Sequence, residues 1–193
     1  YPAAADAKPR PWAIFFPRAM GIGTLAPGNQ YAELAAFLNQ RGIDVLIVDD
    51  DAALQRLKPP GSTGEKRAAI ALDALAKLRA DGRFDMRCPG VAVGWSRGGE
   101  GALTLASSRS GPDSGFRAAI VYYPSVGGQT SPWPQRMAVL ALQGTGDGIA
   151  PAAKLEALAA GRLKHDEHPF TIKLYPGAKH RFDVRYATDD PAS

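Results

Sequence analysis

Gly94-Trp95-Ser96-Arg97-Gly98 is the stretch of sequence that decides the fold. It follows a short apolar run, residues 91–93, and precedes a segment of small residues that suits the start of a helix. A G-x-S-x-G motif between a strand and a helix is a nucleophile elbow, a sharp turn that lifts the serine hydroxyl out of a sheet. Because side chains two positions from the serine would clash with the neighbouring elements, both positions must be small. The motif therefore predicts that Ser96 is a nucleophile in a strained backbone conformation.

Short apolar runs alternate with amphipathic segments along the rest of the chain. Runs without polar alternation suit parallel strands that are buried on both faces. Strands that alternate with helices imply right-handed crossovers and an open, mostly parallel sheet with helices on both faces. The last run, 171–175, alternates polar and apolar residues, which is typical of a half-exposed edge strand. The other predicted strands are residues 12–16, 45–48, 91–93, 118–122 and 138–142.

The ends of the expected helices carry capping residues. Asn29 can cap a helix that stops at Gly42, and Ser62-Thr63-Gly64-Glu65 has the form of a capping box. Pro151 suits the first turn of a helix that Gly161 closes. In an open sheet of this kind, ligands bind at the carboxyl ends of the strands. The functional residues are therefore expected in the loops that follow the strands.

Length and composition predict one soluble domain. The 193 residues are 45% hydrophobic, which is enough for a core, and no apolar run approaches the roughly 20 residues of a membrane span. The net charge of +4 comes from scattered basic residues, which argues against a nucleic-acid partner. We expect residues 1–11 to be a flexible leader and residues 12–193 to be the domain. The compartment (cytoplasmic, or secreted or periplasmic if Tyr1 is a processed terminus) and the oligomeric state stay open.

A serine hydroxyl needs a base to remove its proton, and the base needs an acid to hold its tautomer. Asp147 comes just after the apolar run 138–142, and His180 comes just after the run 171–175. Both therefore follow the carboxyl end of a predicted strand, where the loops converge on the elbow. We predict that Ser96 is the nucleophile, that His180 is the general base and then the general acid, and that Asp147 orients His180. Asp183 is an alternative acid.

Backbone N–H groups are expected to stabilise the negative charge that develops on an attacked carbonyl. The N–H of Arg97 follows the nucleophile directly, and a second donor is expected from the loop after the first strand. Arg18 and Ala19 are the candidates, since Pro17 has no N–H. The Arg18 side chain also suits a substrate carboxylate. The predicted substrate-binding set is Arg18, Trp95, Tyr123 and Trp133. Because buried aromatic side chains lie more often in the core than in a pocket, a core role stays open for the three aromatic members of this set.

The sequence also contains fragments of two other kinds of site. His165 and His168 share a charged run, but no cysteine or third ligand lies nearby in the sequence, so no metal is expected. Residues 21–26, with Gly21 and Gly23, match a dinucleotide fingerprint, and Asp49 could pair with a ribose. Pro27 and Gly28, however, interrupt the helix whose N-terminus would bind the phosphates. A dinucleotide-binding domain and a non-catalytic binding module are the alternatives to an enzyme.

Three stretches of this chain, residues 94–99, 146–151 and 175–182, resemble the dienelactone hydrolase family of α/β-hydrolases. The likeness extends from about residue 12 to residue 182. It implies an α/β-hydrolase fold and hydrolysis of small-molecule esters or lactones with no cofactor. No insertion between Tyr123 and Met137 is long enough for a lid, so we expect a minimal form of this fold without one. The namesake enzymes use a cysteine nucleophile and a glutamate in the first oxyanion loop. This chain has Ser96 and no carboxylate in residues 17–21, so we predict a variant with a serine nucleophile.

Overall fold

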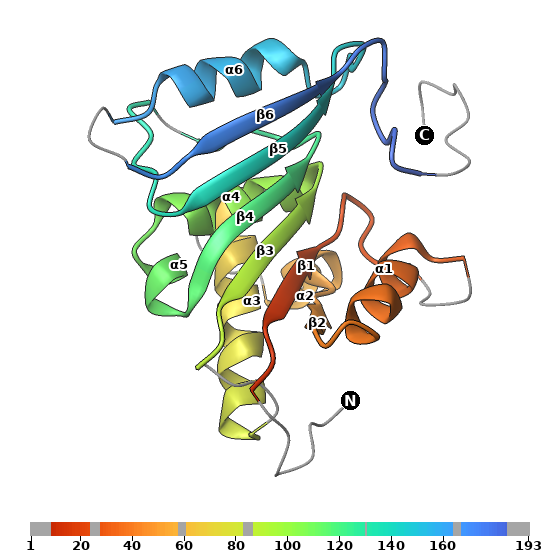
Figure 1. The fold of residues 1–193 in the computed structure, drawn as a ribbon, viewed down its shortest axis with the longest axis vertical. Helices are drawn as coiled ribbons and strands as arrows, with labels where there is room; N and C mark the ends of the chain where they lie inside the picture. The colour runs from red at the N-terminus through yellow and green to blue at the C-terminus, as the bar shows by residue number, and fades with distance from the viewer. Residues whose placement is uncertain are drawn as a thin grey trace.

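The computed structural model describes residues 9–23, 28–57, 61–82, 87–129, 131–163 and 167–184. Within these residues, six parallel strands form one sheet in the order β2-β1-β3-β4-β5-β6 (Figure 1). All six predicted strands are confirmed, and β6 lies at one edge as expected. The strands are β1 (Trp12–Phe16), β2 (Asp44–Ile47), β3 (Gly90–Trp95), β4 (Phe116–Tyr122), β5 (Ala138–Gly144) and β6 (Phe170–Tyr175).

The predicted caps are present at the helix ends. The Asn29 side chain accepts the N–H groups of Tyr31 and Ala32, and Ser62 and Glu65 form the capping box. Pro151 was expected inside the first turn of its helix but lies just before it, with an extended ψ of 134°. Two short helices were not predicted, α2 and α5. The helices are α1 (Gln30–Asn39), α2 (Asp50–Leu57), α3 (Thr63–Ala80), α4 (Arg97–Ser107), α5 (Ser110–Asp113) and α6 (Ala152–Ala160).

Helices cover both faces of the sheet, as predicted. Side chains of β1 alternate between two apolar clusters, because successive strand residues point to opposite faces. Trp12, Ile14 and Phe16 belong to the larger cluster, which contains side chains of α2, α3, α4 and α6. Ala13 and Phe15 belong to the smaller cluster, which contains side chains of α1. β1 is therefore buried on both sides, which explains its continuous apolar sequence.

A buried ion cluster joins two of the helices on the larger face. Arg67 of α3 is 1% exposed and pairs with Asp50 and Asp51 in the first turn of α2. Burial outweighs the attraction of Arg67 and raises the pKa of Asp50 to about 6. The short helix α2 is thus fixed to α3 through charged groups as well as through apolar contacts.

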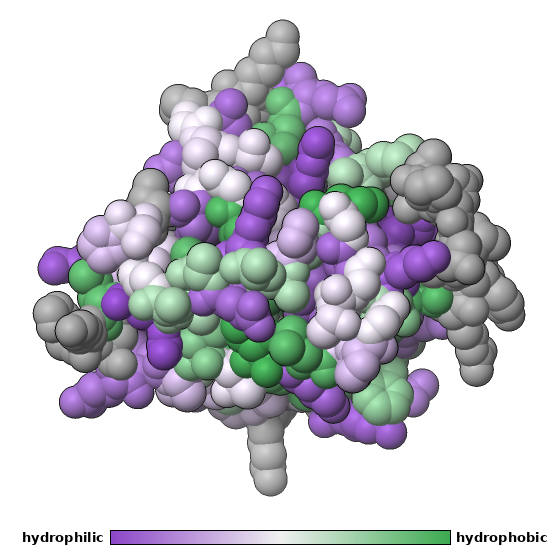
Figure 2. Space-filling view, turned by 90° about the horizontal axis from the view of Figure 1, so that it is seen from above, coloured by the Kyte–Doolittle hydropathy of each residue, from purple (hydrophilic) through white to green (hydrophobic). Residues whose placement is uncertain are grey.

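Parts of two predictions lie outside the described residues. These parts are residues 1–8 of the expected leader and residues 185–193 of the expected domain. Within the described residues, none of the helices combines the length and the apolar character that crossing a membrane requires. Figure 2 views the molecule from above, and hydrophobic and hydrophilic residues are interspersed on that side.

Candidate active site

The turn between β3 and α4 has the geometry predicted for an elbow. Ser96 has φ 52° and ψ −117°, a conformation that side-chain-bearing residues rarely adopt, so the expected strain is confirmed. A Cβ at Gly98 would lie 2.0 Å from the carbonyl oxygen of Phe16, and one at Gly94 would lie 2.6 Å from the carbonyl oxygen of Gly98. Both positions therefore require glycine. Gly99, which the motif alone did not single out, has the same requirement, because its Cβ would lie 2.7 Å from the Pro124 side chain.

Ser96, His180 and Asp147 come together at the carboxyl ends of β3, β5 and β6. His180 Nε2 lies 3.0 Å from Ser96 Oγ, and His180 Nδ1 lies 2.7 Å from Asp147 Oδ2. The hydrogen bond between His180 and Ser96 joins residues 84 positions apart in the sequence. The arrangement can pass a proton from the hydroxyl to the imidazole while the carboxylate faces the other ring nitrogen.

Asp147 is buried and held by four donors. Its Oδ1 accepts the backbone N–H groups of Ile149 and Ala150 at 2.9 and 2.8 Å, and its Oδ2 accepts the Gln143 amide at 3.2 Å as well as His180 Nδ1. These contacts hold the loop before α6 and not the helix itself. Gln143 is fully buried at the end of β5 and was missed by the sequence analysis, because a lone glutamine carries no motif.

Asp183, the alternative acid, faces other partners. Its Oδ2 accepts the Trp95 indole N–H at 2.7 Å, and its Oδ1 accepts the Tyr123 hydroxyl at 2.6 Å. Asp147 occupies the position beside His180 Nδ1 instead. Geometry thus separates the two carboxylates, which sequence order alone left open.

The loop after β1 offers one of its two candidate N–H donors. The Arg18 N–H donates to the Tyr31 hydroxyl at 3.1 Å, which leaves the Ala19 N–H as the candidate for a developing oxyanion. Burial raises the pKa of Tyr31, so its hydroxyl stays neutral. Tyr31 lies in the first turn of α1 and was not among the site residues predicted from the sequence. The signal that could have identified it is its hydroxyl, because a buried tyrosine hydroxyl usually has a hydrogen-bond partner in a neighbouring segment.

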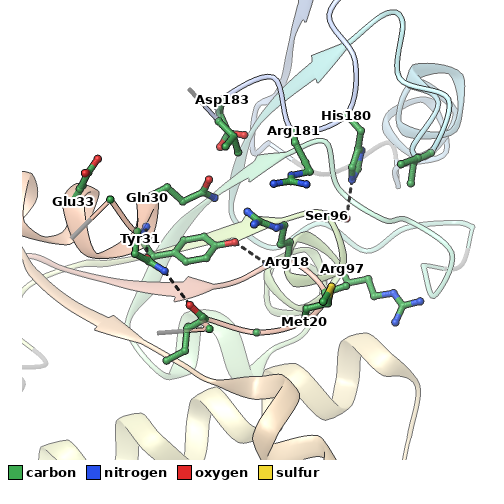
Figure 3. Close-up of a pocket in the computed structure, with 18 residues that line it drawn as sticks. Arg18, Met20, Gln30, Tyr31, Glu33, Ser96, Arg97, His180, Arg181 and Asp183 are labelled. Carbon is green, nitrogen blue, oxygen red and sulfur yellow. Dashed lines mark hydrogen bonds between the residues drawn. The ribbon is translucent and has the colours of Figure 1, made fainter. Parts of the chain in front are cut away.

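A pocket of about 1070 Å³ opens beside Ser96 and His180 (Figure 3). Met20 and Ile149 are 92% and 62% exposed and contribute apolar surface to its lining. Arg18 and Arg181 point into it in Figure 3 and contribute positive charge. The other lining residues include Ile22, Gln30, Tyr31, Glu33, Asp183 and Val184.

Of the four predicted substrate-binding side chains, Arg18 lines this pocket, whereas Trp95, Tyr123 and Trp133 lie in the core. The three aromatic residues are 2%, 0% and 1% exposed, respectively. The Trp95 ring stacks on Tyr122 with centroids 5.3 Å apart. Trp133 belongs to the larger core cluster, which also contains side chains of α6. Burial of a large aromatic ring lowers the free energy of the folded protein. The core role that the sequence left open for these three residues is therefore the one that the structure shows.

The other candidate sites gain no support from the geometry. Among the described residues, no group of three or more His, Cys, Asp and Glu side chains could hold a metal ion. His168 is exposed, and His165 lies outside the described residues, as do residues 24–27 of the dinucleotide fingerprint. Asp49 accepts the N–H of Ala52 at 3.3 Å and so caps α2.

Comparisons with known proteins agree with this fold. The model of the dienelactone hydrolase family matches residues 34–193. Esterase 2 of Thermogutta terrifontis, solved after phosphonylation by cyclosarin, is 18% identical with a TM-score of 0.66, and the match covers 100% of this chain and 81% of that chain. A puromycin-hydrolyzing peptidase of Mycobacterium tuberculosis is 20% identical with a TM-score of 0.69, covering 92% of this chain and 32% of that chain. Among curated proteins, none matches this sequence.

Proposed function

This chain belongs to the dienelactone hydrolase family, and we propose that it is a serine hydrolase that cleaves carboxylic esters or lactones through an acyl-enzyme. The observation that carries the proposal is the hydrogen-bonded series Ser96–His180–Asp147 at the wall of a pocket. A nucleophile, a base and a buried acid in this geometry are the components that acyl transfer requires.

In the first half of the proposed reaction, Ser96 Oγ attacks the ester carbonyl carbon and passes its proton to His180 Nε2. Asp147 holds the Nδ1–H and stabilises the imidazolium ion. When the tetrahedral intermediate collapses, the bond to the leaving oxygen breaks, and His180 gives that oxygen the proton. In the second half, a water molecule attacks the acyl carbon, His180 again acts as the base, and the acid product leaves Ser96 protonated.

The negative charge on the tetrahedral intermediate requires donors that are already oriented. The Arg97 N–H is suited to this role, because it lies in the first turn of α4 and has no partner within the helix. The Ala19 N–H is the proposed second donor, since the Arg18 N–H is engaged by Tyr31.

The pocket lining favours a small substrate that is apolar near the ester and polar farther away. Met20 and Ile149 would contact the apolar part, and the Arg18 guanidinium would attract an anionic or strongly polar part. No metal or cofactor enters the proposed steps.

A panel of p-nitrophenyl esters of increasing chain length, together with simple lactones, tests the proposal. Wild-type protein is expected to hydrolyse at least one member and to be labelled at Ser96 by a fluorophosphonate, a reagent suggested by the phosphonylated state of the similar T. terrifontis esterase. Ser96→Ala should do neither. If correctly folded wild-type protein showed neither hydrolysis nor labelling, a non-catalytic binding module would be the better explanation.

A further inference from the structure

Asp183 joins the loop that carries His180 to the carboxyl ends of β3 and β4, next to the turn that carries Ser96. The carboxylate accepts one hydrogen bond from the Trp95 indole and one from the Tyr123 hydroxyl, at 2.7 and 2.6 Å. Trp95 directly precedes Ser96, and Asp183 follows His180 by three positions. The two bonds therefore connect the neighbourhoods of the proposed nucleophile and the proposed base.

Both donors are buried and depend on this carboxylate. Trp95 is 2% exposed and Tyr123 is fully buried. Burial raises the pKa of Tyr123, so its hydroxyl remains a donor throughout the neutral range. If Asp183 moved away, an indole N–H and a phenol O–H would lose their partner inside the core, which is unfavourable. The contact therefore resists opening.

The segment around His180 is held on both sides. Before His180, the Ala178 carbonyl accepts the N–H of Gly146 at 3.0 Å, which ties the segment to the loop that carries Asp147. After His180, Arg181 has φ 64°, a strained conformation that persists only where neighbouring contacts hold it. The bonds of Asp183 supply a hold of this kind.

Tyr123 also supports the imidazole itself. Its ring meets the His180 ring edge-on, with centroids 4.6 Å apart. The Tyr123 hydroxyl, by donating to Asp183, fixes the direction in which this ring points. Any tilt of Tyr123 would therefore shift the surface against which His180 packs.

We propose that Asp183 is a positioning residue, which acts through Trp95 and Tyr123 to hold the His180 imidazole within hydrogen-bond reach of Ser96. The inference rests on the proposed serine hydrolase function. It deepens that function by assigning a second carboxylate, distinct from Asp147, to the placement of the base.

The test compares Asp183→Ala with Asp183→Asn. The asparagine can keep both links, because its amide oxygen accepts the Trp95 N–H and its amide nitrogen can donate to the Tyr123 oxygen. We expect Asp183→Ala to lower kcat by about 10- to 100-fold with little change in KM, since small misplacements of catalytic groups have effects of this size. Asp183→Asn should recover most of the activity. Asp73→Ala, which alters an exposed aspartate on α3, is the matched control and should retain wild-type kcat.

A spectroscopic measurement separates positioning from stability. The proton on His180 Nδ1, between the imidazole and Asp147, should give a low-field NMR resonance in wild type and in Asp183→Asn. In Asp183→Ala, measured well below its unfolding temperature, the resonance should broaden or disappear. Wild-type kcat together with a wild-type resonance in Asp183→Ala would overturn the proposal. Loss of activity in Asp183→Asn equal to that in Asp183→Ala would overturn it as well.

Should Asp183→Ala fail to fold, Tyr123→Phe provides the second variant. This variant keeps the ring against His180 but removes one of the two hydrogen bonds to Asp183. We therefore expect kcat to fall by a smaller factor than in Asp183→Ala. An unchanged kcat would count against the proposal. The NMR resonance does not require turnover. If wild-type protein hydrolysed nothing, the resonance would still report whether Asp183 positions His180, so the two failures are distinguishable.

Discussion

Gly98 packs so closely against the end of β1 that an added Cβ would lie 2.0 Å from the carbonyl oxygen of Phe16. This contact brings the elbow and the loop after β1 together. The two proposed oxyanion donors, the N–H groups of Arg97 and Ala19, belong to these two segments.

Gly98→Ala is therefore expected to destabilise the protein by more than about 3 kcal/mol, because the methyl group would overlap backbone atoms that cannot move aside cheaply. Gly127→Ala is the matched control, since a Cβ added there would meet nothing within 4 Å and no strained φ is involved. Denaturant unfolding of the two variants measures the difference. Equal stabilities would show that the elbow tolerates a side chain at position 98.

Asp147→Asn should lower kcat by about 10⁴-fold, because an amide cannot hold the imidazole in the tautomer that accepts a proton from Ser96. Ser96→Ala should lower it by about 10⁶-fold, as in other serine triads. Steady-state kinetics on the most reactive ester of the panel provides both values, with Ser110→Ala as an exposed serine control. A loss of less than tenfold in Asp147→Asn would remove that residue from the proposed triad.

Tyr31→Phe tests which N–H of the loop after β1 meets the oxyanion. The substitution removes the oxygen that accepts the Arg18 N–H and loosens the loop that presents Ala19. If the Ala19 N–H is the donor, kcat should fall by about tenfold. This loss is smaller than the roughly 100- to 1000-fold loss on removing an oxyanion donor, because the Ala19 N–H is still present but is held less firmly. An increase in kcat would instead indicate that Arg18, once freed, is the better donor.

Asp50 gives stability a pH dependence that does not involve the proposed active site. Its pKa rises from 3.8 to about 6 in the folded protein, so the folded state holds this proton more tightly than the unfolded state does. The contribution to stability is fully present below 3.8 and is lost as the pH rises to about 6. The free energy of unfolding of wild type, minus that of Asp50→Asn, should therefore decrease across this window. A difference that stays constant or grows would contradict the raised pKa.

The strands, the helix caps and the Ser96–Asp147–His180 set were predictable because each leaves a local trace. A buried parallel strand is a continuous apolar run, a capped helix begins with Asn29 or Ser62, and the three polar residues each follow a strand. Helix α2 left no such trace, because its eight residues are too few for a clear helical period.

The environment of the site was less predictable, because it depends on where side chains point across the fold. Trp95 is adjacent to Ser96, yet its ring lies in the core, because Trp95 is the last residue of β3 whereas Ser96 lies in the turn that follows the strand. Tyr31 acts through its hydroxyl, which accepts the Arg18 N–H, and the Gln143 amide donates to Gly144 and to Asp147 and Ala150 in the loop that follows β5. Asp183 is nearer than Asp147 to His180 in the sequence, but its carboxylate turns toward two aromatic donors.

The parallel direction of all six strands has a practical consequence for anyone who wishes to immobilise this protein. Every group proposed to take part in the reaction lies beyond the carboxyl ends of the strands, whereas the chain enters β1 at Trp12 from the opposite end of the sheet (Figure 1). A tether placed ahead of Trp12 would therefore attach each molecule from the side opposite to its pocket. Substrates would reach an array made in this way without passing between neighbouring molecules.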